Sequence, residues 1–194
     1  DKFKKQNADD WVALMTPILK SFATDVGVES ANLAIQIYGG HGYIKDHGIE
    51  QLLRDARIAT IYEGTNGIQA LDLVGRKMPM HTGRLLKSFF HIVKEYLEKN
   101  SFNYNLSEFI PPLAKSFGRL QQVTSFIASK GLNNPDEAAG PATDYLKMFS
   151  LVAIGYVWTQ YAEISSNKQK DDPEGFYKAK IDSGKYYMSK ILPE

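Results

Sequence analysis

Residues 36–69 decide how this chain folds, and they read QIYGGHGYIKDHGIEQLLRDARIATIYEGTNGIQ. Two breaks that contain glycine, at residues 39–48 and 61–64, interrupt a pattern that is otherwise helical. Gly39 and Gly40 predict the end of the preceding helix, because glycine readily takes the left-handed conformation of a C-terminal cap. Thr65 or Asn66 can cap the next helix. This stretch therefore predicts helices that are joined by two tight loops.

Helical patterns continue on both sides of this stretch. Thr16-Pro17 predicts a helix start, with a hydroxyl N-cap before a proline at the first helical position. Apolar residues at a spacing of three or four then predict a buried stripe. The members of this stripe are Leu19, Phe22, Val26, Leu33 and Ile37. Further helices are expected at about 49–59 and from residue 65 or 66 to about Arg76.

The second half of the chain shows four more helical patterns beyond the punctuation at Pro79 and Gly83. Their apolar residues fall within 86–97, 113–127, 151–161 and 177–191, the last after Pro173, and a loop is expected from Gly131 to Pro141. No alternating strand pattern of useful length is present. The sequence predicts an all-α fold in which residues 1–80 form one helical domain and residues 81–194 an up-and-down helical bundle. With only three helices, the first domain is expected to pack against something outside the chain or against a second subunit.

Composition excludes several function classes. A formal net charge of +1 gives no case for nucleic acid or an anionic membrane as the main partner. The longest apolar stretch, Met148–Trp158, is well short of the roughly 20 residues that a membrane span needs. The chain has no cysteine, which excludes disulfides, a thiol nucleophile and thiolate metal sites. The four histidines have no metal-ligand spacing, so no metal site is expected.

Three motifs in residues 36–69 could carry chemistry. Glycines around Gly39 would let backbone approach a phosphate closely, but on spacing alone a helix cap and a turn explain them. Arg54-Asp55-Ala56-Arg57 predicts an exposed helix face with local ion pairs.

Glu63 lies at a break between helices, where a general base would be held firmly yet could face a pocket. An apolar pocket would raise the pKa of Glu63 by desolvation. The residues alone favour the other interpretation, an exposed carboxylate that stabilises the next helix N-terminus.

Taken together, the blocks Gln-x-x-Gly-Gly-x-Gly-Tyr, Arg-Asp-x-Arg-Ile and Ile-Tyr-Glu-Gly-Thr resemble the acyl-CoA dehydrogenase family. The resemblance covers Thr16 to Arg76, the last part of the family's C-terminal helical domain. It implies a flavoenzyme that uses FAD to introduce a double bond between Cα and Cβ of an acyl-CoA thioester. Glu63 matches the base that removes the α-proton, in the position that short- and medium-chain enzymes use, and Gly64 matches a position that lines the thioester site.

The resemblance also implies the cofactor contacts and the partners. Gln36, Gly39 and Gly40 match the segment that reaches the FAD of a neighbouring subunit, and Thr65, Asn66 and Gly67 match the helix start that touches FAD on the catalytic side. Electron-transfer flavoprotein would accept the electrons, and a homodimer or homotetramer is expected. The compartment would be the cytoplasm for a bacterial parent or the mitochondrial matrix for a eukaryotic one.

Two departures from the family pattern lead to further expectations. Ala70 stands where many members have arginine, which resembles a bacterial-type subgroup with an extra C-terminal helical domain. The family's N-terminal helical domain and β-domain have no counterpart in the sequence, so we expect a fragment of a longer protein that is inactive by itself. The alternative is a noncatalytic helical module for oligomer assembly or membrane-surface docking, for which the aromatic-rich second half is the only support.

Overall fold

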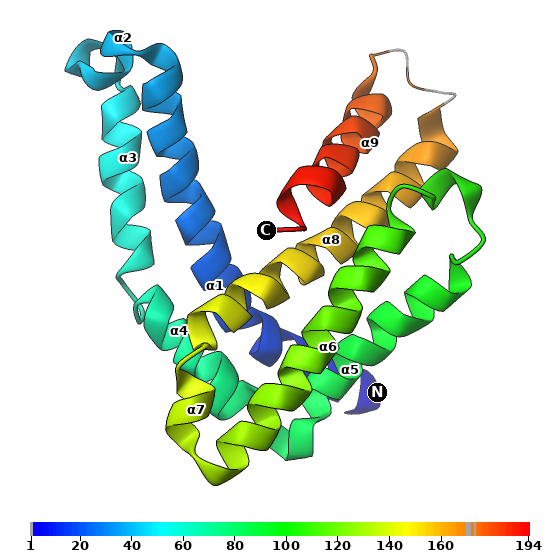
Figure 1. The fold of residues 1–194 in the computed structure, drawn as a ribbon. Helices are drawn as coiled ribbons and strands as arrows, with labels where there is room; N and C mark the ends of the chain where they lie inside the picture. The colour runs from blue at the N-terminus through cyan, green and yellow to red at the C-terminus, as the bar shows by residue number, and fades with distance from the viewer. Residues whose placement is uncertain (1, 170–171, 173) are drawn as a thin grey trace. The chain divides into compact units, whose positions relative to one another are not determined.

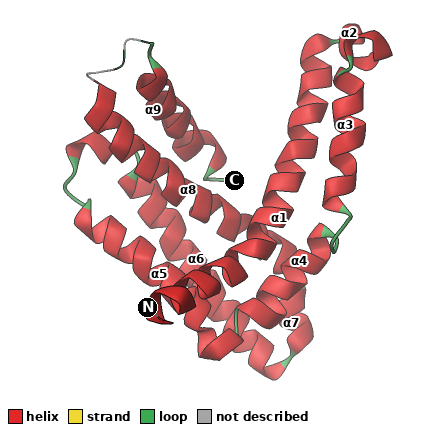
Figure 2. Ribbon diagram, turned by 180° about the vertical axis from the view of Figure 1, so that it is seen from behind, coloured by secondary structure: helices red, strands yellow, loops and turns green. Residues whose placement is uncertain are grey.

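The structure is a computed structural model that describes every residue except 1, 170–171 and 173. Every regular element in this described part is a helix, and it contains no strand (Figures 1 and 2). The all-α prediction is therefore confirmed. Pro173, expected just before the last helix, lies outside the described residues.

The main helices, in chain order, are α1 (Lys2–Tyr38), α2 (Gly40–Tyr43), α3 (Ile49–Arg57), α4 (Asn66–Asp72), α5 (Met80–Lys99), α6 (Ile110–Asn133), α7 (Pro135–Ala139), α8 (Ala142–Lys168) and α9 (Phe176–Tyr186). Single turns of 3-10 helix are η1 (Lys45–His47), η2 (Ile58–Thr60) and η4 (Tyr104–Leu106). The π-helical turns η3 (Leu73–Lys77) and η6 (Tyr187–Ile191) continue α4 and α9.

The chain forms two compact units. The hairpin unit consists of residues 1–85 and 134–147, and the bundle unit consists of residues 86–133 and 148–194. The predicted division of the intact protein into domains 1–80 and 81–194 stays a prediction.

The hairpin unit is named for α1 and α3, which run side by side (Figures 1 and 2). Its core lies where the first half of α1 meets α4 and η3, and it contains Leu14, Ile18 and Leu73, all at most 1% exposed. Near the start of α1 the buried Asp10 carboxylate accepts two hydrogen bonds from the Arg84 guanidinium, at 2.7 and 2.9 Å. These hydrogen bonds lower the pKa of Asp10.

The predicted helix start at Thr16-Pro17 is wrong, because α1 begins at Lys2 and runs through Pro17. The Thr16 hydroxyl does not cap a helix; it donates to the carbonyl oxygen of Val12, one turn earlier, at 2.7 Å. Threonine makes this backward hydrogen bond inside helices. Leu14 and Ile18, on either side of Pro17, are buried against neighbouring elements. This packing stabilises the helix at the point where proline has no N–H to donate.

The predicted buried stripe on α1 is also wrong for most of its members. Leu19, Val26, Leu33 and Ile37 are 53%, 40%, 52% and 82% exposed, and only Phe22 is partly buried. The buried positions of α1 follow a neighbouring row, Leu14, Ile18 and Ser21, which faces the elements that pack on it. Apart from Phe22, the predicted stripe is an apolar surface that the described residues of the hairpin unit leave exposed.

The bundle unit, in contrast, has a filled core between α5, α6 and α8. The rings of Phe89 and Phe149 lie 4.8 Å apart, and those of Phe90 and Phe117 lie 5.6 Å apart. The predicted stripe of α6 is confirmed, since each of its members is buried: Leu113, Phe117, Leu120, Thr124 and Ile127. The predicted stripe of α8 is only partly right. Leu151 is buried, but Tyr161 is 47% exposed.

The loop predicted at Gly131–Pro141 is wrong in part, because α6 continues to Asn133 and α7 follows at once. The Asn134 side chain accepts a hydrogen bond from the Asp136 N–H at 3.1 Å, and Pro135 takes the first helical position. Asparagine and proline favour turns and helix starts alike, so their presence did not distinguish the two.

No helix in the described part of the chain combines the length and the apolar character needed to cross a bilayer.

Candidate active site

Glu63 lies on a tight turn between η2 and α4 with its side chain exposed. Its φ is +53°, and the φ of Gly64 is +87°, so two successive residues adopt the left-handed conformation. Glycine does so freely, whereas a residue with a side chain is strained there by about 1–3 kcal/mol. Such strain persists only where neighbouring contacts hold it, and it is concentrated at functional sites.

The start of α4 holds one side of the turn. The Gln69 side-chain amide donates to the carbonyl oxygen of Glu63 at 3.0 Å. The Thr65 hydroxyl accepts from the N–H of Ile68 at 3.4 Å, which confirms Thr65 as the N-cap of α4. A Cβ added at Gly64 would lie 3.1 Å from the Gln69 amide nitrogen, so glycine lets the Gln69 side chain lie against the turn.

Lys20 of α1 holds the other side of the turn. Its ammonium group donates to the carbonyl oxygen of Gly64 at 2.7 Å and to Oδ1 of Asn66 at 2.8 Å. The same nitrogen lies 5.9 Å from the centre of the Tyr62 ring. The contact between Lys20 and Gly64 was not predicted, because the two residues are 44 positions apart and no local sequence pattern connects them.

The Asn66 side chain is directed toward α1. Its amide nitrogen lies 2.7 Å from an Asp25 carboxylate oxygen and 3.0 Å from the Thr24 hydroxyl, and its oxygen accepts from Lys20. Both polar groups of the side chain are therefore engaged inside the hairpin unit. The predicted FAD contact of Asn66 stays a prediction, and in this geometry the backbone N–H would have to make it.

The second predicted cofactor segment lies at the C-terminal end of α1. Gly39 ends this helix with φ +57°, as predicted. A Cβ added at Gly39 or Gly40 would meet no atom within 4 Å, and the Gln36 side chain is exposed. This backbone is open to close approach by a phosphate group, which is a property that FAD binding there would need.

Gly42 fixes the fold of the loop that follows. A Cβ at this buried glycine would lie 2.6 Å from the carbonyl oxygen of Ile35, so only glycine lets α2 turn back against α1. The same loop brings two histidines together, with Nδ1 of His41 3.1 Å from Nε2 of His47. No sequence pattern indicated this pair. In the described part of the chain, no three His, Cys, Asp or Glu side chains are placed to hold a metal ion.

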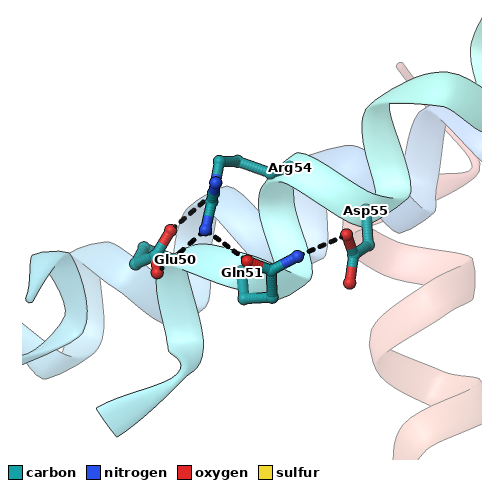
Figure 3. A network of polar contacts seen from close by, with 4 residues as sticks. All are labelled: Glu50, Gln51, Arg54 and Asp55. Atoms are coloured by element: carbon teal, nitrogen blue, oxygen red, sulfur yellow. Dashed lines mark hydrogen bonds and ion pairs between the residues drawn. The ribbon is translucent and has the colours of Figure 1, made fainter. Parts of the chain in front are cut away.

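The Arg54 motif on α3 forms the local ion pairs that were predicted (Figure 3). Nε of the exposed Arg54 donates to a Glu50 carboxylate oxygen at 2.7 Å, and the Gln51 amide donates to Asp55 at 2.6 Å. At the end of the helix Arg57 donates to the hydroxyl of Thr60. The network stiffens the element that leads into the Glu63 turn but contains no candidate for chemistry.

The structure separates the predicted site residues into two groups. Gln36, Gly39 and Gly40 lie near one end of α3, and residues 63–67 lie beyond its other end (Figure 1). The two groups do not form one pocket within the hairpin unit.

Two family models match the chain. Residues 89–194 match a family described as "Acetyl-CoA dehydrogenase C-terminal like", and residues 3–78 match "Acyl-CoA dehydrogenase, C-terminal domain". The chain belongs to the acyl-CoA dehydrogenase family, and it corresponds to a C-terminal part of it.

Named relatives agree with this assignment. A butyryl-CoA dehydrogenase of Syntrophomonas wolfei is 27% identical over 100% of this chain and 32% of the relative. A 3-methylmercaptopropionyl-CoA dehydrogenase of Ruegeria pomeroyi is 28% identical over 98% of this chain and 33% of the relative. The crystal structure of Caenorhabditis elegans ACDH-11 in complex with C11-CoA has a similar fold, with a TM-score of 0.70 and 21% identity over 94% of this chain and 29% of that one. The chain thus spans about a third of the length of these relatives.

Proposed function

We propose that this chain carries the catalytic base and part of the cofactor-binding surface of an FAD-dependent acyl-CoA dehydrogenase. The observation that supports this most strongly is the Glu63 turn. Its carboxylate is exposed, its backbone is held in a left-handed conformation, and contacts from α1 and α4 hold the turn from two sides. Family membership and the names of the relatives support the same conclusion.

Glu63 would act on the α-proton of the acyl thioester. This proton is only weakly acidic in water, so its removal requires a well-placed base and stabilisation of the charge that develops on the thioester carbonyl. Glu63 takes the proton while the Cα–H bond breaks, and the electron pair left behind forms the Cα=Cβ double bond as the β-hydrogen leaves. The β-hydrogen would leave with its electron pair as a hydride, and bound FAD would supply the hydride acceptor. Gly64, next to the base, would line the thioester site.

The residues present fit FAD at two places. The open backbone of Gly39 and Gly40, with Gln36 beside them, would accept the diphosphate and adenosine part of a cofactor in a neighbouring subunit. The helix start at Thr65, Asn66 and Gly67 offers N–H groups without partners inside the helix, which suit an anionic or polar part of the cofactor. Because these groups lie at opposite ends of α3, we propose that they contact two different cofactor molecules in a homodimer or homotetramer. This chain alone would be inactive.

The substrate class and the electron acceptor follow from the same proposal. The substrate is an acyl-CoA, the class that the names of both relatives contain. Electron-transfer flavoprotein would reoxidise the cofactor.

The test uses the full-length, FAD-loaded enzyme that contains this chain. Anaerobic butyryl-CoA should bleach the flavin absorbance near 450 nm in the wild type. Glu63→Gln should retain FAD but lose bleaching by at least about 1000-fold, because an amide cannot take the proton. Glu98→Gln, which changes an exposed carboxylate on α5, is the matched control and should bleach normally. Unchanged bleaching in Glu63→Gln would overturn the proposed function.

A further inference from the structure

We propose that Lys20 is a positioning residue for the catalytic turn, holding the Glu63 backbone in its left-handed conformation by binding the carbonyl oxygen of the following residue, Gly64. The proposal rests on the function proposed for Glu63. It adds Lys20 of α1 to the residues of the Glu63 turn, 63–67.

The Lys20 ammonium group makes two hydrogen bonds to the turn at once. One goes to the carbonyl oxygen of Gly64 at 2.7 Å and the other to Oδ1 of Asn66 at 2.8 Å. An ammonium group has three N–H donors, and charged donors form stronger hydrogen bonds than neutral ones. The partly buried position of Lys20 on α1 limits competition from water.

These contacts act on the strained part of the backbone. The Gln69 amide binds the carbonyl oxygen of Glu63, and Lys20 binds the next carbonyl, that of Gly64. Two successive carbonyl groups are thus held from opposite sides, by α4 and by α1. Because φ of Glu63 is +53°, the turn would relax toward commoner conformations if one of these contacts were lost. Relaxation would displace the carboxylate from the α-carbon of the substrate.

Lys20 is not needed to keep α4 against α1. The Asn66 amide also contacts Asp25 at 2.7 Å and Thr24 at 3.0 Å, and Ala70 of α4 is buried. Loss of the ammonium group should therefore move the Glu63 turn without unfolding the unit. This separates a positioning role from a structural one.

The experiment compares Lys20→Met with Lys20→Arg in the full-length, FAD-loaded enzyme, and uses Lys5→Met on the exposed start of α1 as the matched control. Single-turnover bleaching is measured with butyryl-CoA and with butyryl-CoA deuterated at Cα. For Lys20→Met we expect unchanged FAD content and butyryl-CoA affinity, with a bleaching rate lower by about 10- to 100-fold, as for a base that is displaced by about 1 Å. The α-deuterium isotope effect should increase, because proton removal becomes more strongly rate-limiting.

Lys20→Arg should recover part of the rate, because a guanidinium can donate to both oxygens. A normal rate in Lys20→Met would overturn the proposal, and so would loss of FAD or of substrate affinity together with the rate, which would mark Lys20 as structural. Equal rates in Lys20→Met and Lys20→Arg, both low, would also contradict it. Glu63→Gln is measured alongside: if it bleaches normally, the proposed function fails, whereas if only Lys20→Met bleaches normally, the positioning role alone fails.

Discussion

The two units of this chain differ in what their apolar residues do. In the bundle unit, large side chains such as Phe149 and Leu120 are fully buried. In the hairpin unit, α1 and α3 present apolar side chains that nothing in the unit covers, among them Leu33 and Leu52, 52% and 55% exposed. Both units expose some large apolar side chains, Phe102 and Leu132 of the bundle unit among them, but α3 of the hairpin buries none of its residues.

The predicted cofactor-binding and catalytic residues are distributed in the opposite way between the two units. Every predicted cofactor or catalytic residue lies in the hairpin unit, on or beside its two glycine-containing breaks. Polar contacts in this unit hold backbone in unusual conformations, as at Glu63 and Gly64. In the bundle unit the contacts described above are mainly aromatic packing. Under the proposed function, the unit whose paired helices α1 and α3 leave apolar side chains uncovered would also be the unit that contacts ligands and other chains.

Removal of a core ring from the bundle unit should have the largest effect on stability. Phe149→Ala should lower the free energy of unfolding of the 194-residue chain by about 3–5 kcal/mol, because it leaves a cavity beside Phe89. Leu33→Ala, on the uncovered face of α1, should lower it by less than about 0.5 kcal/mol. Urea unfolding followed by circular dichroism measures both. Equal losses would contradict the difference between the units.

Gly42 tests whether the loop at the end of the hairpin is set by close backbone contact. Gly42→Ala should cost about 1–3 kcal/mol, since its Cβ would lie 2.6 Å from the Ile35 carbonyl oxygen and the backbone must move. Gly27→Ala, in an open position on α1, should instead stabilise the chain by up to about 1 kcal/mol. Hydrogen exchange should show faster opening of residues 40–48 in the first variant alone. Equal exchange in both variants would show that the loop does not depend on this contact.

The Asp10–Arg84 pair should give the smallest effect, and one that depends on pH. Because the folded state lowers the pKa of Asp10, the pair stabilises the chain fully above the unfolded-state value of about 3.9 and ceases to do so as pH falls through the lower folded-state pKa. At pH 7, Asp10→Asn should lose about 1–2 kcal/mol.

The difference between Asp10→Asn and wild type should close as the pH is lowered below about 4. Thermal melts across this range measure it. Asp9→Asn, at the exposed neighbouring position, is the control and should differ from wild type by less than about 0.5 kcal/mol throughout. A constant difference for Asp10→Asn at every pH would show that its carboxylate charge is not what stabilises the unit.

Structural features that depend on a few neighbouring residues, such as helix ends, were predictable from the sequence. Gly39 ends α1 and Thr65 caps α4, because each acts on its own turn of backbone. The prediction of a helix start at Thr16-Pro17 was wrong for a related reason. The threonine hydroxyl can cap a helix or bond backward to Val12, and neighbouring residues do not decide between these two roles.

Features that depend on distant residues or on absent partners were not predictable. Periodicity identified Leu33 as part of an apolar face but could not show whether another element covers that face. Lys20 comes close to Gly64 only because α1 packs on α4, so no sequence motif indicated the hydrogen bond between them. The left-handed conformation of Glu63 was equally hidden, since a turn that contains Glu-Gly normally places the glycine alone there.

The most direct test of the central claim is a comparison of Glu63→Asp and Glu63→Gln by single-turnover flavin bleaching with butyryl-CoA in the full-length, FAD-loaded enzyme. Aspartate keeps a carboxylate but withdraws it by one methylene, whereas glutamine keeps the length and loses the base. If Glu63 removes the α-proton, Glu63→Asp should bleach at least about tenfold faster than Glu63→Gln while both retain FAD. Equal rates in the two variants would contradict the account and leave Glu63 as a residue of the turn alone.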